Sequence, residues 1–579
     1  MEFLLINHTK EILPYMEEML AASVIAIDTE TTGLDPHTCE IRLIQLAVEE
    51  IPVLIIDCST FLPEGLPILR EIILSKAVKI FQNAKFDLQF LLALNIPAPK
   101  AVFDTMLAAQ LLRSSGGPQR VRLEDLVLHY LGENLSKEKQ KSDWSGILSK
   151  EQLTYAAKDA AVLLPLRDKM LVEIIKNKLV EVARQEFSCA RAIAQVEYNG
   201  INLNLKLWEE LIKKIELEQQ NCLKKLYEYS GKPTIQTGFF DEKVLNTINM
   251  DSNKQILNIL NRYGIPVSNT SRHALAPFSD NPLIQAITEY RRCTKLLSGF
   301  LYSIPQHLNP KSLRLHPKYS QMGAWSGRMS CGGPNIQQIP RDNNFRACFT
   351  ASPGNKLVIA DYSQIELRVV AEISKDECMI RAYRNGEDLH RLTAALVSGK
   401  PIAQITKEER QSAKAMNFGL VFAMGAKGLQ IYAQETYGVD MTLEEAEQFR
   451  NRFFTAYHGV ASWHKRLKNN PPKESRTLAG RIHVYSDNFG VASLSNTPVQ
   501  GSAADIIKNA LGRLAYKLDI TTTKIVAVIH DEIILETKSE LALEVSIILK
   551  ETMEKAGEEY VKLIPILADV QIADSWAEK

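Results

Sequence analysis

Short apolar runs alternate with amphipathic stretches through the first 175 residues. Residues 24–27, 41–48 and 53–56 are rich in Val, Ile and Leu, which is typical of strands. Helical periodicity separates these runs. The pattern predicts a mixed α/β domain over residues 1–175.

A long helix is predicted over residues 205–230, where Leu207, Leu211 and Ile215 recur at helical spacing with charged residues between them. Gly231, followed by Pro233, marks its expected end. One narrow apolar face predicts a solvated helical projection. Residues 240–290 are only weakly patterned.

The pattern changes again beyond about residue 312. Residues 356–360 form an apolar strand that ends at Asp361, and residues 403–435 have the periodicity of a helix. Residues 524–529 and 533–536 predict two strands joined at a turn that contains Asp531. We therefore expect Asp361 and Asp531 to face each other across a cleft.

Length and composition narrow the class of protein. At 579 residues the chain is too long for one hydrophobic core, so about three to five structural units are expected. The formal net charge is zero, so a nucleic-acid partner would need local basic surfaces. The eight cysteines contain no C-x-x-C pair, which argues against zinc or a disulfide framework and favours a reducing compartment. No apolar run reaches the length of a membrane span, so no membrane partner is expected.

Four carboxylates in the first domain form one candidate metal site. Asp28 and Glu30 are two residues apart on a predicted strand and share a face, and Tyr155 and Asp159 share a helical face. Together with Asp87 these carboxylates would repel one another unless cations neutralised them, and hard oxygen ligands favour Mg²⁺ or Mn²⁺. Two such ions could activate a water for phosphodiester cleavage, with Tyr155 orienting the water. An isolated Asp-x-Glu would more often be ordinary surface charge.

A second candidate site combines carboxylates with a helical stripe. Asp361 and Asp531 could hold two ions that activate a 3′ hydroxyl and clamp a triphosphate. The stripe consists of residues that recur every fourth position, two cations followed by two aromatic rings: Arg410, Lys414, Phe418 and Phe422. Cations suit phosphates and a flat ring suits a base. Taken alone, the stripe also fits an amphipathic helix with a solvated basic end.

These motifs resemble two known families. Residues 20–165 resemble the DnaQ-like 3′→5′ exonucleases of the subtype that ends in Tyr-x-x-x-Asp. The later motifs resemble family A DNA polymerases, those like bacterial DNA polymerase I. They are residues 361–368 (Asp-Tyr-Ser-Gln-Ile-Glu-Leu-Arg), residues 410–419 (ending Lys-Ala-Met-Asn-Phe-Gly) and residues 528–533 (Val-Ile-His-Asp-Glu-Ile). Residues 326–329, 334–340, 388–394 and 498–506 match as well.

The resemblance implies an architecture of α/β and α+β domains. Residues 1–175 would form an RNase H-like exonuclease domain, and residues 176–579 a right-hand polymerase domain. The thumb would span about 176–310, the palm about 311–375 and 490–579, and the fingers about 376–489. Asp28 falls in the first strand-rich stretch, so the resemblance implies no 5′ nuclease domain within these residues.

The resemblance also assigns roles to residues. The exonuclease metal ligands would be Asp28, Glu30, Asp87 and Asp159, with Tyr155 at the attacking water. The polymerase metal ligands would be Asp361, Asp531 and the carbonyl of Tyr362, with Glu532 supporting the metal site or the primer terminus. Residues at the incoming nucleotide would be Tyr362, Gln364, Glu366, His390, Arg410, Lys414, Phe418 and Phe422. Residues at the primer or template would be Arg328, Asn496, Gln500 and His530.

Some of these roles are specific. Glu366 would lie under the sugar and exclude a 2′-hydroxyl. Lys414 could give a proton to the pyrophosphate leaving group. Phe418, as Phe and not Tyr, predicts poor use of dideoxynucleotides. The expected cofactor is two Mg²⁺ per site, with Mn²⁺ able to substitute. The expected partners are primer-template DNA and dNTPs, bound by a monomer in the cytoplasm of a bacterial or virus-infected cell.

The chain departs from the family pattern in the fingers and beyond. Phe422 stands where Tyr is usual, Ala423 where Gly is usual and Ala492 where Arg is common, and residues 482–495 look shortened. These departures predict altered template positioning and weaker primer-template contact. They also motivate a rival hypothesis, a nuclease whose second half only holds duplex DNA. Retention of Asp361 and Asp531 argues against that rival. Reverse transcription stays open as a third hypothesis, because Glu366 filters the incoming sugar and not the template.

Overall fold

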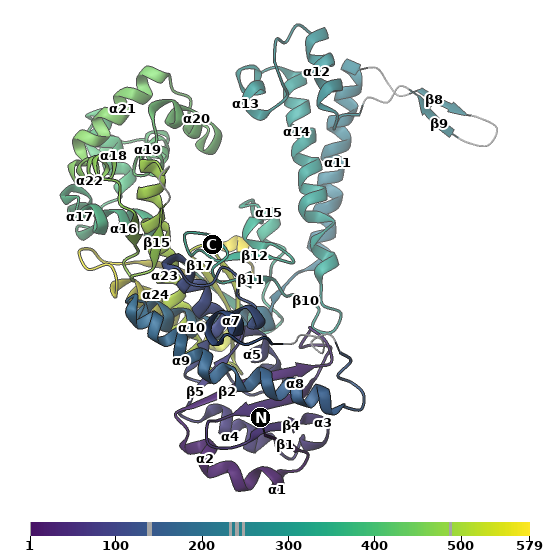
Figure 1. Cartoon of the computed structure of the whole chain (residues 1–579). Coiled ribbons are helices and arrows are strands. Elements are labelled where there is room, and N and C mark those ends of the chain that lie inside the picture. The colour runs from purple at the N-terminus through teal and green to yellow at the C-terminus, as the bar shows by residue number, and fades with distance from the viewer. Residues whose placement is uncertain (1, 136–141, 231–233, 238–241, 246–248, 486–488) are drawn as a thin grey trace.

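The computed structural model describes residues 2–135, 142–230, 234–237, 242–245, 249–485 and 489–579. An N-terminal α/β lobe lies at the bottom of Figure 1, a second sheet lies above it, and two helical arms rise on either side. The left arm contains α17–α22 and the right arm contains α11, α12 and α14. Among the described residues, no helix combines the length and apolar character needed to cross a membrane.

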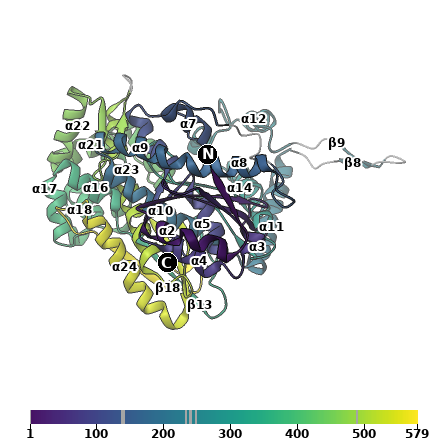
Figure 2. The same cartoon turned by 60° about the horizontal axis from the view of Figure 1, so that its bottom comes forward.

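The N-terminal lobe is built on a six-stranded sheet of order β1-β4-β3-β2-β5-β6, in which β3 runs antiparallel to both of its neighbours. The strands predicted at residues 24–27, 41–48 and 53–56 are confirmed as β2, β3 and β4. Figure 2 shows α8 on one side of the sheet and α2 and α4 on the other. The strands are β1 (Phe3–Ile6), β2 (Val24–Thr31), β3 (Ile41–Ala47), β4 (Val53–Asp57), β5 (Val78–Phe81) and β6 (Val102–Asp104). The main helices are α2 (Met16–Ala21), α4 (Leu66–Leu74), α5 (Ala84–Ala93), α6 (Thr105–Leu112), α7 (Leu123–Leu131), α8 (Lys150–Ala161) and α9 (Leu163–Lys176).

The right arm is an antiparallel helix pair that confirms the predicted projection. Helix α11 (Leu205–Ser230) packs along α14 (Pro282–Leu296), and α12 (Asn253–Arg262) and α13 (Arg272–Leu275) cover its tip. The weakly patterned segment 240–290 therefore contains helices that the sequence pattern did not predict. The expected helix end at Gly231 lies outside the described residues.

The second sheet is four-stranded and antiparallel, in the order β16-β17-β13-β18. Its strands are β13 (Asn355–Tyr362), β16 (Thr523–Ile529), β17 (Glu532–Lys538) and β18 (Ala568–Ala573), as predicted for the first three. Helices α23 (Val491–Lys517) and α24 (Ala542–Glu558) pack against each other beside it.

The left arm consists of short helices, and here one prediction is wrong. Residues 403–435 do not form one helix: α19 ends at Leu420, and α20 begins at Ala426 after a turn. Ala423, in this turn, has the left-handed φ of 60°. The arm contains α17 (Glu377–Arg384), α18 (Leu389–Ser398), α19 (Lys407–Leu420), α20 (Ala426–Tyr437), α21 (Leu443–Ala456) and α22 (His458–Asn469), and α16 (Ile365–Ser374) lies at its base.

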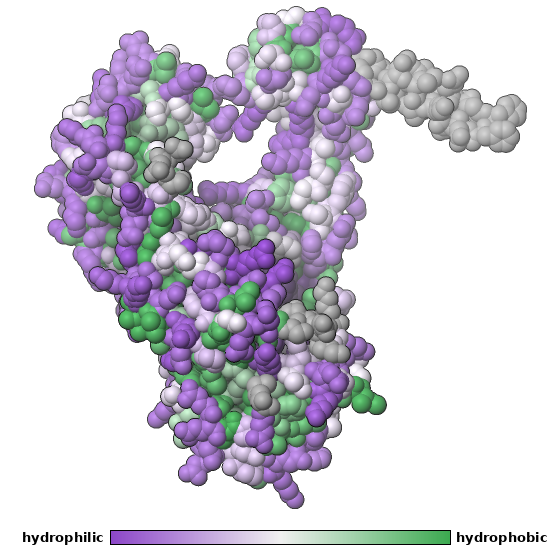
Figure 3. All heavy atoms as spheres, in the orientation of Figure 1, coloured by the Kyte–Doolittle hydropathy of each residue, from purple (hydrophilic) through white to green (hydrophobic). Residues whose placement is uncertain are grey.

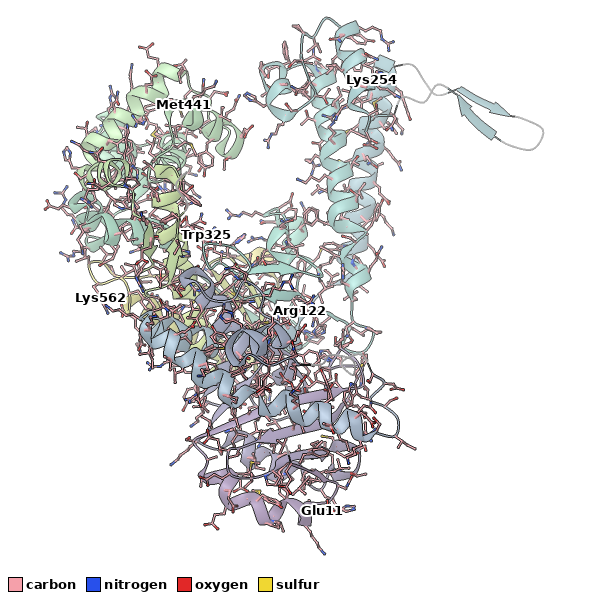
Figure 4. All side chains as sticks on the ribbon, viewed as in Figure 1. Glu11, Arg122, Lys254, Trp325, Met441 and Lys562 are labelled. Atoms are coloured by element: carbon pink, nitrogen blue, oxygen red, sulfur yellow. The ribbon has the colours of Figure 1, made fainter. Side chains whose placement is uncertain are left out.

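The two arms enclose an open cleft above the second sheet. The space-filling view is hollowed between them, and mostly hydrophilic residues line both sides of the opening (Figure 3). Met441 marks one arm and Lys254 the tip of the other, and Trp325 lies near the floor between them (Figure 4). The cleft is the widest opening in this view.

A buried ion network ties the lobes together. Glu186, on α10 (Val180–Asn199), pairs with Arg481 and with Lys508 of α23, whose Nζ lies 2.6 Å from it. Arg481 also pairs with Asp505 at 2.6 Å, and Lys508 donates to the carbonyl of Gly327 at 2.7 Å. All four charged side chains are at most 4% exposed. Charges buried this deeply persist only when they are mutually compensated.

Candidate active sites

The carboxylates of the second sheet meet at the ends of two adjacent strands. The register of β13 and β17 places Asp361 directly opposite Glu532, so their side chains are cross-strand neighbours on one face. Asp531 lies in the preceding turn, where His530 has a φ of 58° and Tyr362 N–H donates to the Asp531 carbonyl at 3.3 Å. Burial and the charge of Asp361 raise the pKa of Asp531 to about 7. The predicted approach of Asp361 and Asp531 is therefore confirmed.

This carboxylate group fits a divalent cation. Asp361 Oδ1 is buried and has no hydrogen-bond partner among the described residues. Its other oxygen, Oδ2, accepts from Lys579 Nζ at 2.6 Å, and Glu532 pairs with the same ammonium. Trp576 Nε1 holds the second oxygen of Glu532 at 2.5 Å. A positive charge thus already lies among these oxygens, and one ligand oxygen remains without a partner.

A cavity of about 320 Å³ opens beside the carboxylates. It joins residues that are widely separated in sequence and whose roles were predicted: Arg328, Gln364, Glu366, Phe418, His530 and Asp531. Its remaining lining is Met329, Gln337, Arg341, Ile365, Ala503, Ala504 and Ile507. Arg328 forms an ion pair with Glu366, whose pKa burial raises. Ala503 and Ala504 of α23 and Phe418 of α19 contribute to the apolar part of its lining.

Two cations of the left arm, Arg410 and Lys414, are not among the residues that line this cavity, but Lys414 is close enough to Arg341, which does line it, to feel its charge. Helix α19 starts at a capping box formed by Thr406 and Glu409, which fixes its first turn. Arg410 Nε donates to Asp388 at 2.7 Å. Burial alone would raise the pKa of Asp388, but the bonds from Arg410 and from a backbone N–H hold it below its ordinary value. Burial, followed by the nearby charges of Arg341 and Arg410, lowers the pKa of Lys414.

His390 lies next to this stripe but is buried. Asn417 Nδ2 contacts its Nδ1 at 2.8 Å, and its ring lies 5.9 Å from that of Phe418. Burial lowers the pKa of His390 to about 4, so the ring is neutral at pH 7. Asp388 caps α18 by accepting from the His390 N–H at 2.9 Å.

Phe422 departs from its predicted place on the stripe, whereas the primer or template contacts of Asn496 and Gln500 stay predictions. Phe422 lies beyond the end of α19, so it does not continue the stripe of Arg410, Lys414 and Phe418. The helix stops because the chain turns through Ala423. Asn496 and Gln500 lie within α23, which starts at Val491, and Pro498 is accommodated inside that helix. These three residues are not among those that line the cavity.

Sequence reasoning missed several residues of this site. Arg341 lines the cavity, and its only signal was a position directly after the motif at residues 334–340. Asp388 and Asn417 stand inside recognised motifs and position Arg410 and His390. Nothing in the local pattern around Trp576 and Lys579 indicated that they would contact Glu532.

The first candidate site forms at the end of β2. Asp28 and Glu30 are on one face of the strand, and α8 carries Tyr155 and Asp159 across it. Burial, followed by the charge of Asp159 and then of Glu30 and Asp28, raises the pKa of Tyr155. Such mutual influence requires all four groups to lie close together. The predicted convergence of these residues is confirmed.

Asp87, the remaining carboxylate predicted at this site, contacts β2. It is buried at the start of α5 and accepts from Thr29 Oγ1 at 2.7 Å. Thr29 stands between the two carboxylates of β2, and neighbouring strand residues point to opposite faces. The contact with Thr29 does not itself place Asp87 beside Asp28 and Glu30, so its share in this metal site stays a prediction. Burial, and to a smaller extent the charge of Asp104, raises the pKa of Asp87 to about 7. The hydrogen bond from Thr29 acts in the opposite direction. A cation beside Asp87 would relieve the penalty of burial.

Comparisons with known proteins agree with this geometry. The profile of DNA polymerase family A matches residues 208–578. The chain belongs to that family. A 3′-5′ exonuclease profile matches residues 5–175. The chain is thus a DNA polymerase with a 3′-5′ exonuclease domain, and enzymes of these two families depend on metal ions.

Individual relatives extend over nearly the whole polymerase. DNA polymerase I of Aquifex aeolicus is 36% identical over 581 residues, covering 95% of each chain. DNA polymerase I of Pseudomonas aeruginosa is 29% identical and covers 97% of this chain, which in turn spans 64% of that relative. A solved structure, the POL domain of Pol1 from M. smegmatis in complex with DNA primer-template and dNTP, matches with a TM-score of 0.80 and 25% identity over 98% of both chains.

Proposed function

We propose that this polymerase adds dNTPs to the 3′ end of a primer on a DNA template and removes mismatched 3′ nucleotides, in DNA replication or repair in the bacterial cytoplasm. One observation carries the proposal. Asp361, Asp531 and Glu532 meet at adjacent strand ends, beside a cavity that residues of both the second sheet and the left arm line. The left arm would be the fingers, the right arm the thumb, and the second sheet the palm.

Asp361, Asp531 and the Tyr362 carbonyl would hold the metal ions at the palm. Two Mg²⁺ ions, or Mn²⁺ in their place, would supply Lewis-acid activation of the primer 3′ hydroxyl and charge neutralisation of the triphosphate. Glu532 would keep the carboxylate group in place through its bond to Trp576. These acids need a cation because burial and mutual repulsion penalise their charges.

Three cations, Arg410, Lys414 and Arg341, would bind the triphosphate, with His390 as a neutral hydrogen-bond donor. Asp388 fixes the direction of the Arg410 guanidinium. Burial and neighbouring cations lower the pKa of Lys414, which makes its proton easier to give to the leaving pyrophosphate. Tyr383 OH holds Gln364 at 3.1 Å, on the side of the cavity that carries Glu366.

The sugar and the base pair would meet the other residues of the cavity. Glu366 would lie under the sugar and reject a 2′-hydroxyl, with Arg328 compensating its charge. Phe418 would pack against the nucleotide. Arg328, Asn496, Gln500 and His530 would contact the primer-template, and Phe422 would lie at the template base. Glu366→Ala should therefore raise ribonucleotide incorporation, measured as alkali-sensitive product.

At the second site, Asp28, Glu30, Asp87 and Asp159 would hold the metal ions for trimming. Tyr155 would orient the attacking water, because its hydroxyl is held among these carboxylates and stays protonated. A hydroxyl that donates its one proton to Asp159 can still accept a hydrogen bond from that water, but it cannot itself act as the base.

Two single substitutions test the proposal. Asp531→Ala should abolish extension of a labelled primer with Mg²⁺ and four dNTPs while leaving 3′ trimming intact, and Asp28→Ala should do the reverse. Asp519→Ala is a matched control, since Asp519 is an exposed aspartate in the same region and caps only its own turn. The proposal is wrong if both Asp531→Ala and Asp28→Ala keep both activities.

A further inference from the structure

Lys579 places its ammonium among the carboxylates at the strand ends of the second sheet, which are those of Asp361, Asp531 and Glu532 (the palm carboxylate group). Its Nζ lies 2.6 Å from Asp361 Oδ2 and forms a second ion pair with Glu532. The side chain of Lys579 is 30% exposed and that of Glu532 is 4% exposed, so this is not an ordinary surface pair. One cation therefore neutralises carboxylates from two adjacent strands.

The segment that carries Lys579 is firmly anchored. Trp576 is 1% exposed, and its backbone N–H donates to the Phe349 carbonyl at 2.9 Å. The guanidinium of Arg346 lies 4.3 Å from the centre of the indole ring. Trp576 also reaches Glu532 through its indole N–H, so the two ends of a four-residue segment contact the same carboxylate. The position of Lys579 follows from this anchoring.

We propose that Lys579 is an internal counter-cation that competes with a divalent ion for the Asp361 carboxylate, and so sets the metal concentration at which the palm site fills. The inference rests on the proposed metal site at Asp361 and Asp531. Asp361 Oδ2 already accepts from an ammonium at 2.6 Å, while a Mg²⁺ ligand oxygen must come to about 2.1 Å from the ion. A divalent ion could instead bind Oδ1, which has no hydrogen-bond partner among the described residues. On either oxygen it would share one carboxylate with the ammonium, and the two cations would repel each other strongly.

The contacts explain why an ammonium lies at this position. Without a positive charge, Asp361, Asp531 and Glu532 would repel one another at the strand ends. Lys579 supplies that charge, and its flexible stem allows the ammonium to leave toward solvent when a divalent ion enters. The divalent ion must then bind strongly enough to displace it, which raises the required metal concentration.

Mn²⁺ binding tests this inference directly. Free Mn²⁺ would be counted by electron paramagnetic resonance during titration of the full chain, in an Asp28→Ala, Asp159→Ala background that removes the trimming site. Lys579→Gln should bind Mn²⁺ at the palm about three- to tenfold more tightly than the background protein, because a partly screened competing charge is lost. Lys579→Arg keeps the charge and should change the affinity by less than about twofold.

Lys356→Gln is the matched control. Lys356 pairs with Asp574 at 2.7 Å, in the same terminal segment but away from the metal oxygens. Lys356→Gln should leave the Mn²⁺ affinity unchanged. This control separates loss of the Lys579 ammonium from a general loosening of the segment that carries it. Thermal unfolding in EDTA adds a second measurement: Lys579→Gln should unfold at a lower temperature than the background protein, and saturating Mn²⁺ should recover the difference.

The outcomes separate the two proposals. Unchanged or weaker Mn²⁺ binding in Lys579→Gln overturns the competition by Lys579. The palm metal site itself still stands if Asp531→Asn removes that Mn²⁺ in the same background. If Asp531→Asn removes no Mn²⁺ from either protein, the palm site fails and the role of Lys579 fails with it.

Discussion

Loss of one charge from the buried ion network should weaken the fold far more than loss of a similar charge on the surface. In Glu186→Gln, Lys508 loses a carboxylate at 2.6 Å and keeps the Gly327 carbonyl, while Arg481 keeps Asp505. Two cations then share one carboxylate in a site that is at most 4% exposed. Breaking a buried pair in this way costs about 3–5 kcal/mol. Gln can still accept one hydrogen bond, so we expect a loss near about 3 kcal/mol in the free energy of unfolding.

Glu181→Gln provides the comparison on the same helix. Glu181 pairs with Arg184 at 3.0 Å, but both side chains are about 70% exposed, and such a pair contributes less than about 1 kcal/mol. Urea unfolding followed by tryptophan fluorescence would give both free energies. Lys508 also holds the Gly327 carbonyl next to Arg328. Without the Glu186 carboxylate the ammonium is fixed less firmly there, so Glu186→Gln should also slow primer extension. Equal, small losses for the two variants would refute the reasoning.

Other predictions concern the turn after α19 and the buried histidines. Ala423→Gly should raise the free energy of unfolding by about 0.5–1 kcal/mol, because the φ of 60° at residue 423 suits glycine. Ala426→Gly, in the first turn of α20, should lower the free energy of unfolding. Urea unfolding would contradict this if both variants changed the free energy in the same direction. Burial lowers the pKa of His316, His390 and His483 to about 4 from 6.5. The unfolded chain therefore binds protons first as pH falls, so stability present above pH 6.5 should be lost toward pH 4, on the order of 1–3 kcal/mol per histidine. The raised pKa values of Asp87 and Asp531 act in the opposite direction over this range, so the test is a difference between two proteins. The unfolding midpoint of His390→Gln should lose less on going from pH 6.5 to pH 4 than that of the parent protein; an identical pH dependence would exclude the explanation.

Local pattern predicted those parts of the structure that local physics determines. The strands that carry Asp28 and Asp361, and the two strands that flank Asp531, follow from apolar runs next to carboxylates. The helix at residues 205–230 follows from its narrow apolar face. The end of α19 could not be predicted, since the chain makes a left-handed turn at an alanine where no glycine signals it. Lys579 was missed for another reason. Its contact with Asp361 spans 218 residues and depends on how the last strand docks.

Helix α10 connects the two active sites and limits how a primer end can pass between them. At one end, Glu186 is locked to α23, the helix that contains Gln500. Near the other end, Glu197 accepts from Lys85 at 2.7 Å, two residues before Asp87. Both carboxylates are at most 1% exposed. Separating the domains would break these ion pairs and leave buried charges without compensation, which is strongly unfavourable. We therefore expect the primer end to reach the trimming site by unpairing and not by domain rotation. In Asp531→Ala, trimming should accelerate as one, two and three terminal mismatches are introduced, because each removes a stacked pair worth about 1.4 kcal/mol. Equal rates for paired and mismatched ends at saturating enzyme would show that unpairing does not limit the transfer.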